Sequence, residues 1–375
     1  MIAVVGAGIA GLAAAIALAR RGFTVDVFER AAALQEIGAG IQLSPNAMAV
    51  LGQLDVLNDL AGHLVEPHAI EIRDAKNGRR LAAIPLGQVA RQRYGAPYCL
   101  ARRSDLQAGL VAAARRDPAI GLNLDSEVRN VVANEGGITF SAAGAERHAD
   151  VLVAADGVHS RLRQEHFGYP EAHSLGHTAW RATIPADSAP ASIDRRMTGL
   201  WCGSRAHLVH YPVAAGEHLN IVAIAAGGIG AARPPAERFG STACKLMDAV
   251  EGWTAYPLSV ADIVRPWVRG RVVLIGDAAH AMAPSAAQGG AQAIEDGWML
   301  AVMLADKIRD PVGALRAYEE VRRPRVERVA RVARRNLTIY EMTGVPAHAR
   351  NVALRILPAS FLLSRLDWLF SWRPK

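Results

Sequence analysis

The sequence predicts an α/β protein whose main domain is built on a parallel sheet, with an inserted β-sheet domain and a helical C-terminus. Three observations support this fold class. The first thirty residues read as strand, glycine-rich turn, helix and strand. Two later apolar runs, at 150–157 and 271–280, end in turns that contain aspartate, as buried parallel strands do. From about 176 to 265, apolar and polar residues alternate instead, which indicates antiparallel strands.

The N-terminal unit has the element order of a Rossmann-like domain. Residues 2–5 (IAVV) are all apolar, as in a strand that is buried on both faces. A turn at Gly6, Gly8 and Gly11 leads into LAAAIALARR, an Ala- and Leu-rich helix. Thr24–Arg30 then predicts a second strand, and the right-handed crossover places both strands in one parallel sheet.

The rest of the chain predicts further helices and strands. Residues 102–116 have the apolar spacing of an amphipathic helix, and Ser104 is its predicted N-cap. Short strands are expected at 122–132 and 137–141, and a long helix starts near Gly290. The predicted parts are a discontinuous nucleotide-binding domain (1–70, 97–175 and 267–330), a substrate-binding β-sheet domain (71–96 and 176–266) and a C-terminal helical segment (331–375).

Composition and charge exclude several classes of protein. The chain has 375 residues, of which 51% are hydrophobic and 21% charged, a globular balance. The net charge of +7 comes from scattered arginines without an aromatic-basic patch, so nucleic acid is not an expected partner. Arg316–Arg335 is the densest run, and its interleaved glutamates predict a solvated helix face. The same helix is the candidate face of a homodimer.

Cysteine use and the N-terminus predict a cytoplasmic protein. Cys99, Cys202 and Cys244 are far apart and odd in number, which fits a reducing compartment and predicts neither a disulfide framework nor a metal site. The chain enters a strand at once, which leaves no room for a signal peptide. No stretch reaches the roughly 18 apolar residues of a membrane span, so stable membrane insertion is not expected.

The glycine-rich turn has the spacing of a nucleotide-binding fingerprint. Gly6 permits the tight turn, Gly8 lets the backbone approach a pyrophosphate, and Gly11 lets helix and strand pack closely. Glu29 ends the second strand, where a carboxylate can accept hydrogen bonds from both hydroxyls of an adenosine ribose. An acid at this place disfavours a 2′-phosphate, so the pattern favours FAD or NAD over NADP.

Two aspartates follow later strands and are expected at the same ligand site. Asp156 ends the run DVLVAAD, and Asp277 ends RVVLIGD. At the carboxyl ends of parallel strands, both side chains would point into the ligand crevice. The alternative is that each aspartate only forms a turn.

Taken together, these segments resemble the group A flavoprotein aromatic hydroxylases, the para-hydroxybenzoate hydroxylase-like family, and within it the salicylate, 3-hydroxybenzoate and 6-hydroxynicotinate hydroxylases. The resemblance spans nearly the whole chain, on GAGIAGL, VDVFER, GAGIQLSPNA, RRSDL, DVLVAADGVHSRLR, HLVHYP, GDAAHAMAPSAAQGGAQAIEDG and DWLFSW. It implies an FAD-dependent monooxygenase that uses NADH or NADPH and O2 to hydroxylate a phenolic or N-heteroaromatic acid through a flavin C4a-hydroperoxide. The chain has no second glycine fingerprint, so the nicotinamide would dock transiently, and the branch favours NADH.

The resemblance also implies which residues contact FAD. Glu29 would hold the adenosine ribose and Asp277 the ribityl chain, while Asp156 would shape both the FAD site and the approach of the nicotinamide. Residues 284–291 would pass beside the isoalloxazine ring, with the following helix N-terminus facing the reduced flavin. The full set of implied cofactor contacts is Gly6, Gly8, Ala10, Gly11, Glu29, Arg30, Gln42, Arg103, Val128, Asp156, Asp277, Pro284, Gly289 and Gly290.

His207 and Tyr211 are the candidate catalytic residues. They stand four apart in AHLVHYPV, so on a strand they share one face, while His210 points to the other. In the related hydroxylases a His and a Tyr at matching places contact the phenol, and His207 is suited to take the phenol proton as a general base. The alternative is a core histidine packed beside a tyrosine. No carboxylate nearby completes a zinc site with His207 and His210.

Three further residues bear on the substrate. Arg181 is a candidate partner for a substrate carboxylate, with an ordinary surface arginine as the alternative. Ser285 is a candidate substrate contact. The resemblance implies histidines at the places of Ser44 and Ser285 in 6-hydroxynicotinate enzymes, so losing both leaves the substrate open. The other functions considered are a monooxygenase or epoxidase of a larger apolar compound, and a non-catalytic flavin redox sensor.

Overall fold

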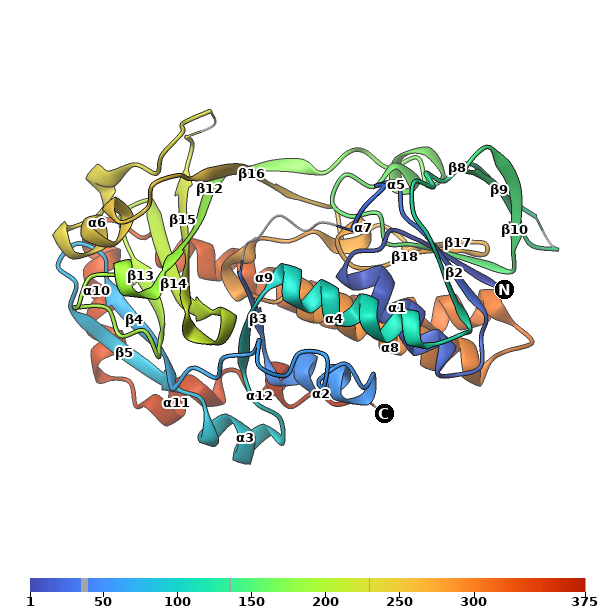
Figure 1. The fold of residues 1–375 in the computed structure, drawn as a ribbon. Coiled ribbons are helices and arrows are strands. Elements are labelled where there is room, and N and C mark those ends of the chain that lie inside the picture. Colours follow the sequence, from blue (N-terminus) through green and yellow to red (C-terminus); the bar gives the residue numbers. More distant parts are fainter. Residues whose placement is uncertain (35–39, 135, 229, 375) are drawn as a thin grey trace.

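A computed structural model describes residues 1–34, 40–134, 136–228 and 230–374 and confirms the α/β prediction (Figure 1). The nucleotide-binding part is built on a six-stranded sheet, parallel except for its first strand. Its strands in spatial order are β17 (Val268–Arg269), β18 (Val272–Leu274), β11 (Val151–Ala154), β1 (Ile2–Val5), β2 (Val25–Phe28) and β7 (Ile120–Asn123). The buried apolar runs of the sequence therefore form the centre of this sheet, as predicted.

Three helices lie together against this sheet: α1 (Ile9–Ala19), α4 (Arg103–Arg116) and α8 (Gly289–Asp306) (Figure 1). The predicted N-cap Ser104 is wrong, because α4 begins at Arg103 and Arg102 occupies the cap. The strand β6 (Cys99–Arg102) runs directly into the helix, so no residue is left to form a separate capping turn.

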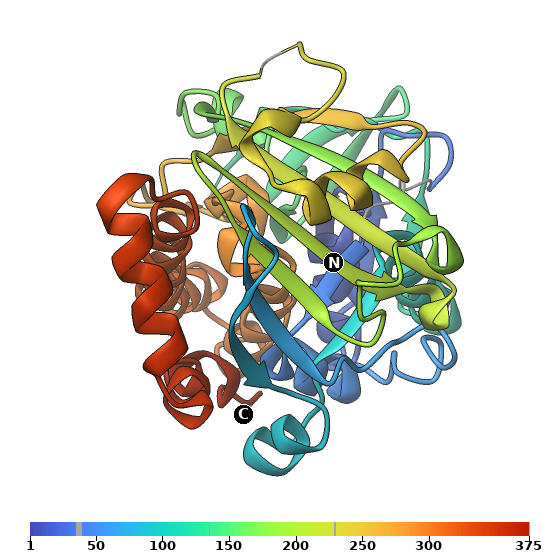
Figure 2. The same cartoon turned by 90° about the vertical axis from the view of Figure 1, so that its left-hand side faces the viewer.

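The inserted part contains a seven-stranded sheet, which faces the viewer in Figure 2. Its neighbouring strands pair antiparallel, as predicted, except for one parallel pair, β13 and β4. The spatial order is β16 (Thr254–Val260), β12 (His173–Pro185), β15 (His218–Ala226), β14 (Ala206–Val213), β13 (Thr198–Cys202), β4 (Ala69–Asp74) and β5 (Arg80–Pro85).

Two smaller sheets contain the remaining described strands. β3 (Gly40–Leu43) pairs with β6 and lies between the two large sheets. β8 (Arg129–Ala133), β9 (Ile138–Ala142) and β10 (Ala145–Ala149) form an antiparallel meander. The sequence did not predict β10, because four of its five residues are exposed and show no apolar alternation. The short helices are α2 (Pro45–Gln53), α3 (Gln88–Tyr94), α5 (Arg161–Glu165), α6 (Ser241–Asp248) and α7 (Asp277–His280).

The long helix α9 (Pro311–Tyr340) connects the two parts of the molecule. Its first half packs into the core of the parallel sheet through Leu315 and Tyr318, and its last turns pack against the seven-stranded sheet through Ala333 and Leu337. Helices α10 (Gly344–Ile356), α11 (Ala359–Ser364) and α12 (Asp367–Phe370) follow along the same side. Among the described helices, none is long and apolar enough to cross a membrane.

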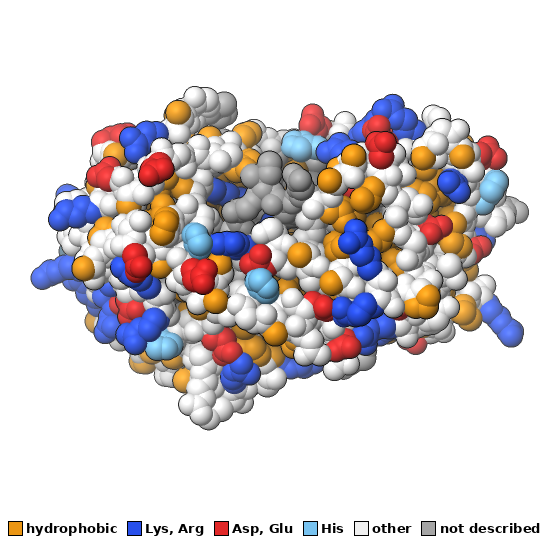
Figure 3. Space-filling model, viewed as in Figure 1, with side chains coloured by type: hydrophobic (Ala, Val, Ile, Leu, Met, Phe, Trp, Pro, Cys, Tyr) orange, Lys and Arg blue, Asp and Glu red, His pale blue; other side chains and the backbone are white. Residues whose placement is uncertain are grey.

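The prediction of a solvated face at Arg316–Arg335 is wrong for part of α9. Arg323 forms the expected ion pairs along the helix with Glu319 and Glu327. Arg322, however, is 1% exposed and pairs with two acids of α8 in the core. A helix face of alternating charge therefore gave no signal that one of its arginines turns inward. On the face of the molecule shown in Figure 3, charges of both signs are scattered.

The domain boundaries, the homodimer and the cytoplasmic location stay predictions. Gly38 and Ala39, which begin the motif GAGIQLSPNA, lie outside the described residues.

Candidate active site

The glycine-rich turn holds the N-terminus of α1 against the parallel sheet. Gly6 has a φ of +103°, and a Cβ on it would lie 2.5 Å from the Ala155 carbonyl oxygen. A Cβ on Gly11 would overlap the Gly6 carbonyl oxygen. At Gly8, in contrast, a Cβ would meet nothing within 4 Å. The turn is thus closed on its protein side and open at Gly8, where helix N–H groups face free space, so it fits the pyrophosphate of FAD.

Glu29 stands beside this turn at the end of β2. Its carboxylate accepts hydrogen bonds from the backbone N–H groups of Ala7 and Ala31, both at 2.9 Å. These contacts hold the acid next to the glycine turn, where a ribose bound there would meet it. Of the other implied cofactor contacts, Arg30 is exposed next to Glu29, and Val128 is buried in the loop between β7 and β8.

Asp156 and Asp277 have different surroundings. The Asp156 carboxylate accepts a hydrogen bond from Ser160 Oγ at 2.6 Å and one from the Leu162 backbone N–H at 3.2 Å. It therefore fixes the start of α5, and its burial raises the pKa of the carboxyl group. Its predicted contacts with FAD and nicotinamide stay predictions.

Asp277 opens α7 directly after Gly276, whose φ is +57°. A Cβ on Gly276 would come within 2.8 Å of the Ala10 Cβ, and one on Gly289 would lie 3.9 Å from Asp277 Oδ1. The structure thus brings the starts of α1, α7 and α8 together, with small residues facing one another. A cofactor that extends from the glycine turn toward Gly289 would pass Asp277.

The segment before α8 supplies backbone and small side chains. Pro284–Ala286 form one turn of 3₁₀-helix, and Ala287 has a left-handed φ of +51°. Ser285 is 9% exposed, and in the part of the chain that the structure describes its Oγ has no hydrogen-bond partner. Arg103 opens α4 directly after β6. Gln42 of β3 accepts a hydrogen bond from Tyr98 at 2.5 Å.

The second component of the site is one face of the seven-stranded sheet. Residues directly opposite one another on antiparallel strands share a face. One row across the sheet is Arg181, Val222, Val209 and Leu200, and the next is Ala179, Ile224, His207 and Cys202. Ala179 and Ile224 pack against Ala283 and Ala286, so this face lies against the segment before α8.

His207 and Tyr211 share this face, as predicted, and His210 lies on the other. His210 is fully buried behind the sheet, where it accepts a hydrogen bond from Trp201 Nε1 at 2.9 Å. Burial lowers the pKa of His210 to about 3, so it stays neutral. His207 is 1% exposed, and its Nδ1 lies 3.0 Å from a carboxylate oxygen of Glu341.

Tyr211 lies beside two residues that the sequence gave no reason to select. Its cross-strand partner is Asn220, whose Oδ1 accepts a hydrogen bond from the Gly40 N–H at 2.8 Å. A Cβ on Gly40 would overlap the Tyr211 ring, so β3 packs directly on this pair. Asn220 is fully buried, and its Nδ2 has no hydrogen-bond partner among the described residues. Burial raises the pKa of Tyr211. The Tyr211 hydroxyl therefore remains protonated and can donate a hydrogen bond.

Arg181 is half-buried on this face, which is not the setting of a surface arginine. Its guanidinium lies over the Tyr256 ring, 5.3 Å from the centroid. Within residues 1–34, 40–134, 136–228 and 230–374 it forms no ion pair or hydrogen bond. Burial lowers the pKa of Arg181, and the nearby Tyr211, Tyr256 and Asp277 oppose this shift. A cation without a carboxylate partner therefore faces the region between the two parts of the site.

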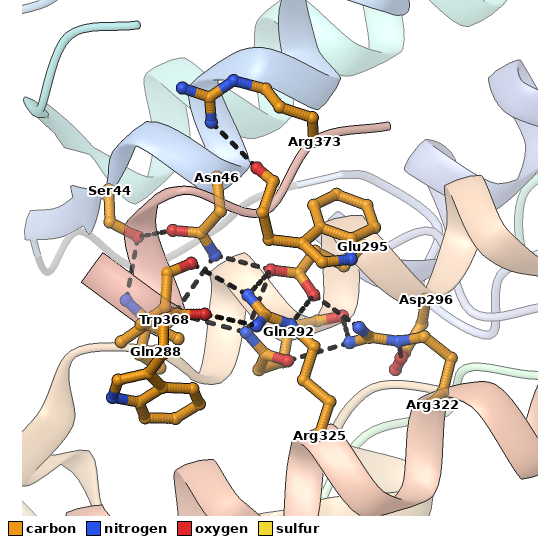
Figure 4. Close-up of polar contacts among 12 residues, drawn as sticks. Ser44, Asn46, Gln288, Gln292, Glu295, Asp296, Arg322, Arg325, Trp368 and Arg373 are labelled. Carbon is orange, nitrogen blue, oxygen red and sulfur yellow. Dashed lines mark hydrogen bonds and ion pairs between the residues drawn. The ribbon is translucent and has the colours of Figure 1, made fainter. Parts of the chain in front are cut away.

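A buried polar network lies under the start of α8 (Figure 4). Ser44 Oγ donates to Asn46 at 2.6 Å and accepts from Gln288 at 2.8 Å, so it is occupied within the protein. Glu295 is bound by Asn46, Arg322 and Arg325, and Asp296 by Arg322 and His280. Arg322 and Arg325 outweigh desolvation and hold the pKa of Glu295 below its usual range. His280 and Arg322 together lower the pKa of Asp296 to about 2. The network anchors α8, whose N-terminus borders the site.

A cavity of about 680 Å³ lies elsewhere, among β8, α5 and Arg269. It is lined by no residue that the sequence analysis selected. The candidate site is therefore defined by the glycine turn and the sheet face and not by this cavity.

Comparisons with known proteins agree with this geometry. A family model described as "FAD binding domain" matches residues 1–205 and 245–333. The chain is 32% identical to a 3-hydroxybenzoate 6-hydroxylase of Polaromonas naphthalenivorans, over 99% of this chain and 96% of that protein. It is 35% identical, over the same shares, to a 3-amino-4-hydroxybenzoate 2-monooxygenase of Streptomyces platensis.

Solved structures show the same fold. The FAD complex of an HpxO variant from Klebsiella pneumoniae superposes with a TM-score of 0.87 at 26% identity, covering 98% of each chain. The resemblance inferred from the motifs is thereby confirmed, as is FAD as the cofactor.

Proposed function

This chain belongs to the FAD binding domain family, and from that premise we propose that it hydroxylates a small aromatic acid that carries a phenolic hydroxyl. The chain is an FAD-dependent monooxygenase, as its relatives are. FAD, when bound, supplies the activation of O2 and the transfer of one oxygen atom. The substrate, the residues that contact it and the nicotinamide are the parts that we propose here.

One observation carries the proposal: the sheet face has a base on β14 and, two strands away on β12, an arginine without a carboxylate partner among the described residues. His207 and Tyr211 are four residues apart on β14, about 13 Å along a strand. Val209 lies between them, and Val222 lies in the same row between Val209 and Arg181, so both valines present an apolar surface. A benzene ring with a hydroxyl at one edge and a carboxylate at the other fits this order of base, apolar wall and cation.

His207 and Arg181 take complementary roles in this proposal. His207 Nε2 accepts the phenol proton: the O–H bond breaks, an N–H bond forms, and the electron pair stays on the ring oxygen. The resulting electron-rich ring is the form that attacks an electrophilic oxygen. Arg181 pairs with the carboxylate, and Tyr211 and the free Nδ2 of Asn220 add hydrogen-bond donors on the same face.

The cofactor would lie along the glycine turn and the starts of α7 and α8. In this arrangement the pyrophosphate would lie against Gly8, and Glu29 would bind the ribose. Asp277 would bind the ribityl chain, and residues 284–291 would border the ring. Because the chain has one glycine fingerprint and not two, the nicotinamide would dock transiently. We propose NADH as the reductant on the resemblance to the hydroxybenzoate hydroxylase branch.

The geometry favours a phenolic acid over the alternatives. Ser44 is engaged by Asn46 and Gln288, so it offers no free group to a ring nitrogen, and Ser285 Oγ is the one free hydroxyl of the two. A half-buried Arg181 without an acidic partner disfavours a larger apolar substrate, since that substrate would leave the cation unpaired.

The test is a panel of aromatic acids offered to the FAD-loaded protein with NADH or NADPH. It includes 3-hydroxybenzoate, salicylate, 3-amino-4-hydroxybenzoate and 6-hydroxynicotinate, with benzoate and phenol as matched compounds that lack the hydroxyl or the carboxylate. We expect one phenolic acid to accelerate NADH oxidation and yield a product heavier by one oxygen atom. Equal stimulation by phenol would remove the role of the carboxylate, and the absence of any oxygenated product from this panel would contradict the proposal.

A further inference from the structure

A buried carboxylate joins two histidines at the end of the substrate-side sheet face. Glu341 follows the last residue of α9, and its side chain is 9% exposed. Oε1 lies 3.0 Å from His207 Nδ1, and Oε2 lies 2.9 Å from His177 Nε2. His177 is on β12 and His207 on β14, so one carboxylate bridges two strands that are not neighbours. In the proposed reaction His207 is the base, and Glu341 has no assigned function.

The hydrogen-bond partners of each imidazole ring determine which of its nitrogens carry hydrogen. His177 Nδ1 lies 3.0 Å from the Leu175 carbonyl oxygen, which can only accept a hydrogen bond. Its Nε2 faces the carboxylate, which accepts as well, so both nitrogens carry hydrogen and His177 is a cation. The hydrogen bond to Glu341 raises the pKa of His177 in agreement with this state.

The partners of His207 imply a different protonation state from that of His177. Its Nδ1 faces Glu341 Oε1 and must carry the hydrogen. Its Nε2 is then the lone-pair nitrogen of a neutral imidazole, the form that can accept a proton. Glu341 thus selects the tautomer in which the base is the nitrogen away from the carboxylate.

We propose that Glu341 is a positioning residue for His207: it fixes the Nδ1–H tautomer and stabilises the imidazolium that forms when Nε2 takes the phenol proton, while His177 moderates this effect. The inference rests on the proposed function, in which His207 is the base. In the proton transfer, the phenol O–H bond breaks and the Nε2–H bond forms. Positive charge then appears on His207 against the negative charge of Glu341.

The other charged and titratable groups around this bridge come from several elements. Tyr340 of α9 presents its ring to the His207 ring, 5.5 Å between centroids, and burial raises its pKa. Cys202 is the cross-strand partner of His207 on β13, and burial raises its pKa to about 12. Both therefore stay neutral near pH 7. The positive charges nearby are Arg238, which opposes protonation of His177, and Arg350, which donates to the Tyr340 carbonyl oxygen.

A purely structural function is the competing explanation. The Glu341 carbonyl oxygen accepts a hydrogen bond from the Arg205 N–H at 3.0 Å, and its side chain ties the end of α9 to the sheet. If Glu341 only holds the end of α9 against the sheet, every substitution in the bridge should lower stability and activity together. The positioning function predicts that removing the carboxylate and removing the second histidine act in opposite directions on His207.

The experiment reads the two histidine rings directly in the FAD-loaded, full-length protein labelled with ¹⁵N-histidine. In the wild type, ring nitrogen shifts at pH 7.5 should report His207 as Nδ1–H and His177 as doubly protonated; His207→Ala and His177→Asn identify the two signals. In Glu341→Gln, the Nε2–H tautomer of His207 should appear, because an amide can also donate. An unchanged His207 tautomer in this variant would overturn the proposal.

Turnover of the acid that the substrate panel identifies gives the second readout. Glu341→Gln should lower kcat by at least about tenfold with a smaller change in KM, because a wrong tautomer removes the base and not the binding site. Glu341→Asp should recover part of the loss. His177→Asn should shift the acidic limb of kcat/KM in the direction opposite to Glu341→Gln, since it removes a cation that competes for the carboxylate.

The outcomes separate the inference from the function on which it rests. If His207→Ala keeps full turnover, the proposed base is wrong, whatever the tautomer. If His207→Ala abolishes turnover and Glu341→Gln changes neither tautomer nor pH profile, the base stands and the positioning function of Glu341 is wrong. If the pH profiles of Glu341→Gln and His177→Asn shift in the same direction, a purely structural function of Glu341 would be favoured and the positioning function would be wrong.

Discussion

The cofactor side and the substrate side of this site are built in different ways. On the cofactor side, the requirement is that backbone come close to backbone, so that Gly6 and Gly11 have no room for a Cβ. On the substrate side, the groups come from β12, β14 and β15 and from the end of α9, and they meet only through strand pairing. A site defined by backbone geometry leaves a local pattern in the sequence, whereas a site assembled across a sheet leaves isolated residues.

We expect alanine substitutions in the glycine turn to have the strongest consequences, and they test whether the cofactor side depends on close backbone contacts. Gly11→Ala would place a methyl group on the Gly6 carbonyl oxygen, so we expect loss of folded protein or of FAD binding altogether. Gly8→Ala meets open space in the protein and should fold with nearly unchanged thermal stability, yet bind FAD much more weakly. Thermal melting and flavin fluorescence check both. Tight FAD binding by Gly8→Ala would contradict the placement of the pyrophosphate.

A second large effect is expected in the buried network beneath α8. Arg322→Met would leave Glu295 and Asp296 without their central cation, at a cost of about 3–5 kcal/mol in the free energy of unfolding. Arg323→Met is the matched control on the next residue, and it should cost about 1 kcal/mol or less because its ion pairs are exposed. Urea unfolding measures both. Similar costs for the two variants would show that the network does not anchor the cofactor side.

The same network predicts how the protein responds to acid. The pKa of Asp296 is lowered from 3.8 to about 2, and that of Glu295 is also lowered, so both acids bind protons more readily when unfolded. Their contribution is complete above about pH 5, beyond the unfolded pKa values of 4.5 and 3.8, and is lost as the pH falls toward about 2. The wild type should therefore lose stability more steeply than Arg322→Met over this range. Parallel profiles would contradict the assignment of the ion pairs.

A smaller effect on the substrate side tests whether Arg181 meets the carboxylate. Arg181→Met keeps the length of the side chain and removes the charge, and we expect kcat/KM for the acid to fall about 10- to 100-fold. Thermal stability should change little, because among the described residues the arginine has no ion pair to lose and only its contact with the Tyr256 ring is weakened. Arg196→Met, exposed and paired with Asp194, is the control. Selectivity for the acid over the matching phenol that survives in Arg181→Met would contradict the carboxylate contact.

How far the sequence could predict the molecule follows the same division. The apolar runs and the glycine spacing predicted the parallel sheet, because burial on both faces and a tight turn each restrict which residues fit. The shared face of His207 and Tyr211 was predictable from strand periodicity alone. The unsatisfied amide of Asn220 and the bridge through Glu341 depend on register and on where α9 ends, and neither leaves a local signal.

Two predictions failed for identifiable physical reasons. Ser104 lost its capping function because β6 continues into α4 without a turn. The charge pattern of α9 could not show that Arg322 points inward, because its partners are supplied by another helix. In both cases a local propensity was overridden by a tertiary contact.

A crystal structure of the FAD-loaded protein with the aromatic acid that the panel selects would show how the substrate binds. We expect the carboxylate within hydrogen-bond distance of Arg181 and the hydroxyl within hydrogen-bond distance of His207 Nε2, with the ring against Val209 and Val222. A ring bound in the reverse direction, or away from this sheet face, would contradict this expectation.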